Sequence, residues 1–138
     1  MRSVLNQDQF TPFGLWIRQY LPKSEDGISV TNLDYIIEDF RNKKIMLLEE
    51  KSNGGKLHRA QCLTFEVLDR VLFHNAPKLG YEYWGMFILQ FPHGCDMPGP
   101  GMKLNDMVIS AEKLQAHLSF KDKAVEPFRF KWRKDLVA

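Results

Sequence analysis

The stretch 32–51 reads NLDYIIEDFRNKKIMLLEEK and contains two apolar runs joined by the polar segment RNK at 41–43. Two such runs around a short polar segment are typical of a β-hairpin. If the turn centres between residues 41 and 42, the residue numbers of strand partners add to 83. Asp34 then lies opposite Glu49, with Cβ atoms about 5 Å apart. Lys51 projects on the same face, because side chains alternate along a strand.

Two carboxylates and one ammonium on a patch of an apolar hairpin are suited to binding a divalent cation. Mg²⁺ takes oxygen ligands, usually one or two carboxylates together with waters and substrate phosphate. The bound cation polarises a phosphoryl group and helps to deprotonate the attacking water. A neighbouring lysine can offset charge that develops in the transition state. The segment Glu49–Lys51 is the only acid-any-Lys triplet in the chain.

At these residues the chain resembles the PD-(D/E)XK nuclease superfamily, which has the restriction-endonuclease-like fold. That family places an acid on one strand of a hairpin or meander and (D/E)-x-K on the next. A helix precedes the hairpin, and a helix and a further strand follow it. The resemblance covers residues from about 12 to 110. It implies that Asp34 is the motif aspartate and that Glu49 and Lys51 are the acid and lysine of (D/E)-x-K. The main-chain carbonyl of Glu50 would then complete the metal shell.

Some branches of this family add a glutamine on the following helix, in a Q-x-x-x-Y arrangement. Gln61 with Phe65 is similar, although phenylalanine stands where tyrosine is expected. The sequence departs from the family pattern in two other places. Leu33 precedes Asp34 where the family often has proline, and Asp8 is the only acid in the first 24 residues, where the first helix often supplies a glutamate. The resemblance makes Gln61 a candidate for orienting substrate or the catalytic groups, although an ordinary glutamine at the boundary of the buried helix face explains it equally well.

Hydrophobic periodicity and turn residues predict an α/β fold in the order α-β-β-α-β-β-α. The expected elements are a helix at 12–21, strands at 28–39 and 43–51, a helix at 56–74, strands at 81–91 and 107–109, and a helix from the cap at Ser110 to Leu118. Both faces of the hairpin carry apolar residues, so we expect it inside a central mixed β-sheet with helices on both faces. This arrangement is similar to the restriction-endonuclease-like core that the resemblance implies.

Composition is consistent with one globular domain spanning 1–138, with a core at about 12–120 and a basic aromatic tail at 127–138. The hydrophobic content of 44% argues against disorder, and the net charge of +2 does not indicate a partner. The sequence lacks an apolar stretch near the roughly 20 residues of a membrane span, and it begins without a secretory signal pattern. Two cysteines are too few for a disulfide framework. We therefore expect a cytoplasmic protein that does not associate with a membrane.

Two basic segments are candidates for contacts with nucleic acid. His58 and Arg59 lie at the start of the predicted second helix, where they could contact phosphate, although a solvated helix surface also explains them. In the tail, basic residues alternate with aromatic ones and would share one face. These basic residues are Arg129, Lys131 and Arg133. An edge strand with a basic outer face explains the tail equally well.

The resemblance implies a deoxyribonuclease that uses Mg²⁺ or Mn²⁺ and acts on DNA. We expect no added recognition domain, so sequence specificity would be weak or would come from a homodimer or a partner protein. Similar small nucleases occur in phages and mobile elements. One alternative is a catalytically inactive nuclease fold that binds nucleic acid within a larger complex. Another is an interaction protein without a role in nucleic acid, in which Asp34, Glu49 and Lys51 form a simple cross-strand ion pair.

Overall fold

The computed structural model describes residues 11–22, 24–26, 28 and 30–130 and divides the chain into two units, 1–32 and 33–138. The first unit contains α1 (Pro12–Tyr20) and the short 3-10 helix η2 (Ser24–Asp26). Thr11 caps α1, since its Oγ1 accepts a hydrogen bond of 3.0 Å from the Gly14 amide, and Pro12 has the φ that the first turn requires. The helix expected at 12–21 is therefore confirmed. That residues 1–138 form a single domain stays a prediction.

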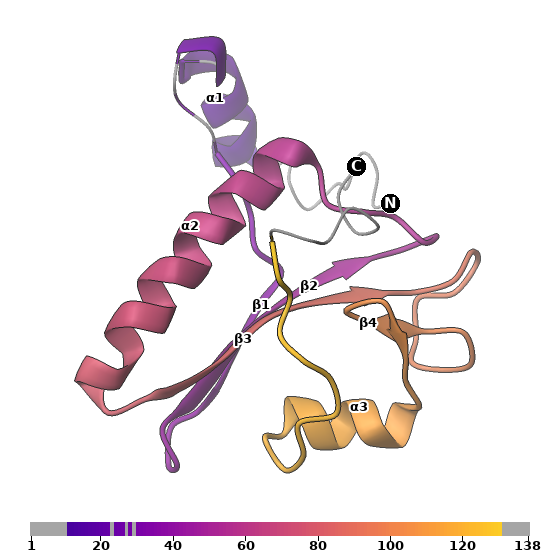
Figure 1. Ribbon diagram of the computed structural model, residues 1–138. Helices are drawn as coiled ribbons and strands as arrows, with labels where there is room; N and C mark the ends of the chain where they lie inside the picture. Colours follow the sequence, from indigo (N-terminus) through magenta and orange to yellow (C-terminus); the bar gives the residue numbers. More distant parts are fainter. Residues whose placement is uncertain (1–10, 23, 27, 29, 131–138) are drawn as a thin grey trace. The chain divides into compact units, whose positions relative to one another are not determined.

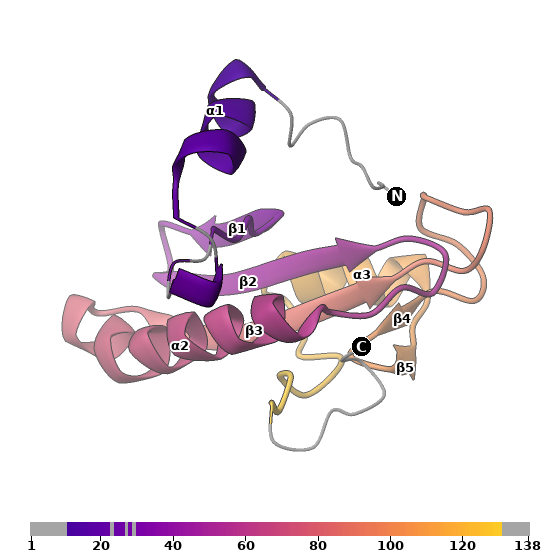
Figure 2. The ribbon, with the colours of Figure 1, turned by 90° about the horizontal axis from the view of Figure 1, so that it is seen from above.

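The second unit is built on a mixed sheet of five strands in the order β1-β2-β3-β4-β5 (Figure 1; Figure 2). β2 and β3 are parallel, and the other neighbouring pairs are antiparallel. The strands are β1 (Tyr35–Asp39), β2 (Lys44–Lys51), β3 (Glu82–Gln90), β4 (Lys103–Leu104) and β5 (Met107–Val108). The α/β class and the mixed sheet are as expected.

The β1–β2 hairpin has the predicted register. Its partners have numbers that add to 83, from Tyr35 with Leu48 to Asp39 with Lys44. The Asp39 carboxylate holds the turn by accepting hydrogen bonds from the amides of Arg41 and Asn42, at 3.1 and 3.0 Å. An aspartate that bonds to the amides two and three residues ahead is a common way to close a turn.

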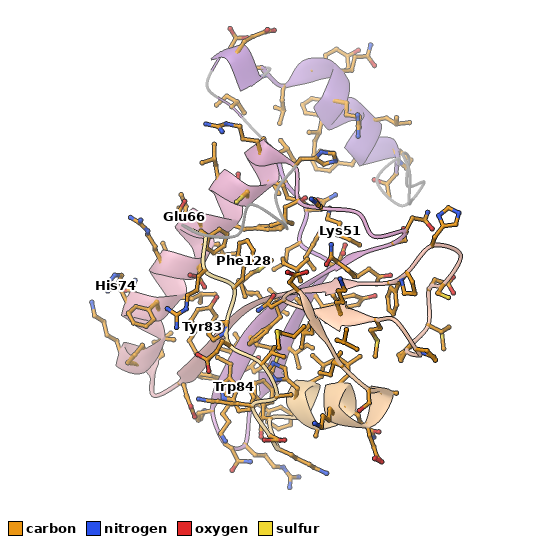
Figure 3. All side chains as sticks on the ribbon, turned by 45° about the vertical axis from the view of Figure 1, so that its right-hand side comes forward. Lys51, Glu66, His74, Tyr83, Trp84 and Phe128 are labelled. Carbon is orange, nitrogen blue, oxygen red and sulfur yellow. The ribbon has the colours of Figure 1, made fainter. Side chains whose placement is uncertain are left out.

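Helices cover both faces of this sheet, α2 (Arg59–Asn75) on one and α3 (Ala111–Leu118) on the other (Figure 1). The parallel pairing of β2 and β3 requires a crossover connection. α2 and the short 3-10 helix η3 (Ala76–Leu79) provide it. The adjacent residues Tyr83 and Trp84 point to the α2 side and the α3 side, respectively (Figure 3). The sheet is therefore buried on both faces, as its apolar strands predict.

Each face of the sheet has its own hydrophobic core. The core under α2 consists of buried residues from β2, β3, the helix and the C-terminal segment: Leu47, Leu57, Cys62, Phe65, Met86, Ile88 and Phe128. The core under α3 includes Met46, Leu48, Trp84, Phe87, Leu89, Met102, Leu104 and Leu114. These two cores fix β2 and β3 in the middle of the unit.

The structure corrects the expected position of the hairpin. β1 is an edge strand, and its Tyr35 and Ile36 side chains are 50% and 64% exposed. β1 also begins at Tyr35, well after residue 28. The ladder stops there because the next amide on β2, that of Glu50, bonds to the side chain of Asp34. The pattern of apolar residues on both faces identified β2 as an interior strand but placed β1 wrongly.

A second hairpin, β4–β5, was missed in part, since only its second strand was expected. Asn105 and Asp106 form its turn with φ values of 47° and 67°, a left-handed conformation that Asn and Asp tolerate. In the tail, the Phe128 amide donates to Met86 O at 2.8 Å and the side chain is buried. The described residues up to Phe130 form no further strand.

In the part of the chain that the structure describes, no helix is both long and apolar enough to cross a bilayer.

Candidate functional site

The carboxylates of Asp34 and Glu49 each accept a hydrogen bond from a main-chain amide on the opposite side of the hairpin, where the β1–β2 ladder ends. The Asp34 amide donates to Glu49 Oε1 at 3.1 Å, and the Glu50 amide donates to Asp34 Oδ2 at 2.9 Å. Each carboxylate therefore accepts a bond from the neighbouring strand, which extends the pairing by one position. The two acids are adjacent across the sheet, as the register predicts.

Lys51 and Gln61 complete the same patch. Gln61 Nε2 donates to Glu49 Oε2 at 2.7 Å, and Lys51 Nζ donates to Gln61 Oε1 at 2.9 Å. Lys51 Nζ also lies 3.4 Å from Glu49 Oε2. The side-chain amide of Gln61 thus bridges the two charged groups: its NH2 group donates to the carboxylate, and its oxygen accepts from the ammonium. All four residues named as catalytic candidates lie together in the structure.

The local sequence explains why α2 begins beside β2. Leu57 is fully buried in the core under α2 and anchors the chain after the turn at 52–55. His58 is the N-cap residue, and Gln61 occupies the third helical position, with its Oε1 3.4 Å from the His58 amide. A glutamine at this position commonly folds back to the cap. Here the same side chain also reaches the end of β2.

The burial of Glu49 sets the electrostatics of this site. Glu49 is only 4% exposed, whereas Asp34 is exposed to solvent. The pKa of Glu49 is raised from its ordinary value of 4.5 to about 7. Desolvation is the main cause, the charge of Asp34 acts in the same direction, and Lys51 opposes both. A buried acid with a raised pKa beside a second acid is a common feature of functional sites.

The donor set suits one hard divalent cation. Two carboxylates with waters and a phosphate oxygen are enough for Mg²⁺. Oδ1 of Asp34 accepts no hydrogen bond among the described residues, whereas both oxygens of Glu49 accept one. No group of three or more His, Cys, Asp or Glu side chains able to hold a metal is found within the described ranges. Of the four carboxylate oxygens of Asp34 and Glu49, Asp34 Oδ1 is therefore the one that is not occupied by a hydrogen bond within the described residues.

Glu50 faces away from this patch, as alternation along β2 requires. Its Oε1 accepts a hydrogen bond of 3.1 Å from the Tyr35 hydroxyl on β1. The assignment of its main-chain carbonyl to a metal shell stays a prediction. Tyr35 was not singled out from the sequence, although its position next to the predicted Asp34–Glu49 pair was a usable signal.

The structure describes some, but not all, of the residues predicted to contact nucleic acid. His58 and Arg59 are exposed at the start of α2, and His58 joins the patch through its amide. Arg129 is exposed, with its guanidinium 3.6 Å from Glu126. Lys131 and Arg133 lie outside the described residues. The start of α2 is therefore the basic segment that the structure connects to the site.

Comparisons with protein-family models, with curated proteins and with solved structures give no match to this chain. The nuclease resemblance consequently stays a prediction that rests on the residues themselves.

Proposed function

We propose that this protein is a nuclease that uses Mg²⁺ or Mn²⁺ to hydrolyse phosphodiester bonds in DNA. The observation that carries the proposal is the contact set of Asp34, Glu49, Lys51 and Gln61, which come from the hairpin and from the start of α2. A cross-strand ion pair alone would not require Glu49 to be buried. Burial of a carboxylate is unfavourable unless another group compensates its charge.

The four side chains have distinct roles in this proposal. Asp34, which is exposed, and Glu49, which is buried, would hold the cation from two sides of the strand end. When bound, the cation would polarise the phosphoryl group and favour deprotonation of the attacking water. Lys51 would offset negative charge that develops on the phosphate. Gln61 fixes the position of the Lys51 ammonium relative to the Glu49 carboxylate through its two hydrogen bonds.

Cleavage of plasmid and single-stranded DNA by the full chain with Mg²⁺ or Mn²⁺ tests the proposal. Lys51→Ala and Asp34→Asn should each lower the rate at least about a hundredfold, because each removes a group that stabilises the transition state. Lys113→Ala and Glu112→Gln serve as controls, since both residues are exposed on α3. If the wild type leaves both substrates intact with either cation, the proposal is wrong.

Calorimetric titration with Mn²⁺ separates cation binding from catalysis. The wild type should bind one ion, and Asp34→Asn should weaken that binding at least tenfold, since it removes one of two carboxylates. Glu112→Gln should bind as the wild type does. If all three proteins give the same titration curve with Mn²⁺, the cation does not bind at Asp34.

The second candidate function is an inactive nuclease fold that binds nucleic acid as a subunit of a larger complex. Two observations favour it. Both oxygens of Glu49 are hydrogen-bonded within the protein, and α1 contains no acidic residue. This candidate predicts salt-sensitive DNA affinity without cleavage, because phosphate contacts release counterions. DNA binding that Lys51→Ala leaves unchanged, together with an absence of cleavage, would support it.

A further inference from the structure

The turn of the β1–β2 hairpin lies at the end of the hairpin opposite the candidate site (Figure 1). Phe40 at this turn is 70% exposed, and Arg41 and Lys43 are exposed next to it. An exposed phenylalanine in a turn contributes nothing to a core. We call the segment Phe40–Lys43 the hairpin tip.

The backbone of the hairpin tip is held in place. Asp39 accepts hydrogen bonds from the Arg41 and Asn42 amides and from Asn42 Nδ2, the last at 2.9 Å. Lys43 has a φ of 58°, in the left-handed region where glycine is favoured. The chain therefore keeps a lysine where a glycine would form the same turn with less strain.

The acids around the hairpin tip are already paired. Glu38 accepts a hydrogen bond from the Tyr81 hydroxyl, and Glu82 pairs with Lys123 at 3.1 Å. Asp39 caps the turn. Lys44 lies opposite Asp39 across the hairpin, where it offsets the charge of that carboxylate, and its ammonium is 5.7 Å from the centre of the Trp84 ring. Lys43 lies over the Tyr81 ring at 5.3 Å, and the Arg41 side chain has no partner among the described residues. The tip is thus an aromatic group surrounded by available positive charge.

The distance between the hairpin tip and the candidate site corresponds to a short length of duplex. Asp34 and Phe40 flank β1 on its two sides and are six positions apart, which is roughly 20 Å at about 3.3 Å per residue. The rise per base pair is about 3.4 Å, so this separation spans about six base pairs. A straight duplex bound at the site could follow the hairpin to its tip.

We propose that the hairpin tip is a second contact with duplex DNA, in which Arg41 and Lys43 approach phosphates and Phe40 packs against the sugar and base edges. This inference rests on the proposed action on DNA. It extends that action by requiring about six base pairs of duplex on one side of the cleaved bond. Apolar side chains among basic ones are a recurrent means of gripping the minor groove.

Binding of labelled duplexes in EDTA, where cleavage cannot interfere, tests this contact. The variants are Phe40→Ala, Arg41→Ala and Lys43→Gly. The matched controls are Phe73→Ala, whose ring is 66% exposed on α2, and Lys113→Ala on α3. On a duplex of about 20 base pairs, each tip variant should raise the Kd roughly three- to tenfold. Each lost cation should also lower the salt slope by about one.

Two further measurements guard against simpler explanations. Lys43→Gly should have a thermal midpoint equal to or above that of the wild type, because it relieves the left-handed residue, so its weaker binding cannot come from unfolding. On a hairpin-capped stem of about four base pairs, which cannot reach both contacts, tip variants and wild type should bind equally.

Tip variants that bind the long duplex with wild-type affinity and salt slope would overturn this inference, as would a wild type without affinity for duplex. A loss of binding to anionic lipid vesicles, with DNA binding unchanged, would also overturn it and assign the tip to membranes. The two proposals fail separately. Cleavage that does not depend on the tip removes only this inference, and tip-dependent binding without cleavage removes only the nuclease.

Discussion

Gln61 Nε2 donates a hydrogen bond of 2.7 Å to Glu49 Oε2, and this contact ties the start of α2 to the end of β2. The same side chain accepts from Lys51 Nζ at 2.9 Å. One neutral amide thus contacts both the buried Glu49 carboxylate and the Lys51 ammonium, which also lie 3.4 Å from each other. This arrangement holds two groups of the proposed catalytic patch in fixed positions before any ligand binds.

Replacement of Gln61 by alanine should destabilise the protein. It leaves Glu49 Oε2 without its amide donor and removes the acceptor of Lys51, which should lower the free energy of unfolding by about 1–3 kcal/mol. Urea denaturation measures the change. Gln115→Ala, on the exposed side of α3, is the matched control and should change stability by less than about 0.5 kcal/mol. Equal effects of the two substitutions would contradict the bridging role.

Glu49 should make the stability of the metal-free protein decrease as pH rises. Its folded pKa of about 7 lies above its ordinary value of 4.5, mainly because the group is desolvated. The folded state therefore binds the proton more tightly, and this contribution is full below pH 4.5 and lost as pH rises to about 7. The loss is on the order of 3 kcal/mol.

The pH dependence of Glu49 can be isolated with the Glu49→Gln variant. The difference in unfolding free energy between wild type and variant should shift in favour of the variant between pH 5 and pH 8. The slope is the informative quantity, because glutamine also changes the hydrogen bond with Gln61. A difference that is constant with pH would show that Glu49 titrates normally.

His117 should act in the opposite direction. It is fully buried on α3, its Nδ1 accepts a hydrogen bond of 3.0 Å from the Ala124 amide, and burial lowers its pKa below the ordinary value of 6.5. The unfolded chain therefore takes up this proton first, so stability is full above about pH 6.5 and decreases as pH falls below it. The difference in unfolding free energy between wild type and His117→Gln should shift in favour of the variant as pH falls below about 6.5, whereas the difference between wild type and His74→Gln, whose histidine is exposed, should not change across this range.

Replacement of Asn105 by alanine should lower the free energy of unfolding more than most substitutions of polar residues. Its Oδ1 accepts from the Ile88 amide at 2.8 Å, and its Nδ2 donates to Glu126 O at 2.8 Å. Alanine leaves these buried groups unpaired, which should cost about 2–4 kcal/mol in thermal or urea unfolding. The matched substitution is Asp106→Gly, in the same turn with a φ of 67°. This substitution should leave stability unchanged or raise it, since glycine adopts this conformation freely. If Asp106→Gly lowers stability as much as Asn105→Ala does, the effect of Asn105→Ala comes from the turn conformation and not from the lost hydrogen bonds.

The candidate site was predictable to the extent that it depends on local pairing. The turn after Asp39 sets the register, and the register brings Asp34 next to Glu49 with Lys51 on the same face. Gln61 was a weaker prediction, because its position depends on where Leu57 anchors the following helix. Its bridge between Glu49 and Lys51 could not be foreseen from spacing alone.

Short-range geometry, which depends on few neighbouring residues, was therefore determined by the sequence itself: the hairpin register, the caps of α1 and α3, and the adjacent acids. Tertiary structure decided what depends on distant packing. It placed β1 at the sheet edge, buried Glu49 under α2, and used Asn105 to join β3 to the segment near Glu126. Burial and edge position arise from surfaces that meet only after folding, so local periodicity cannot specify them.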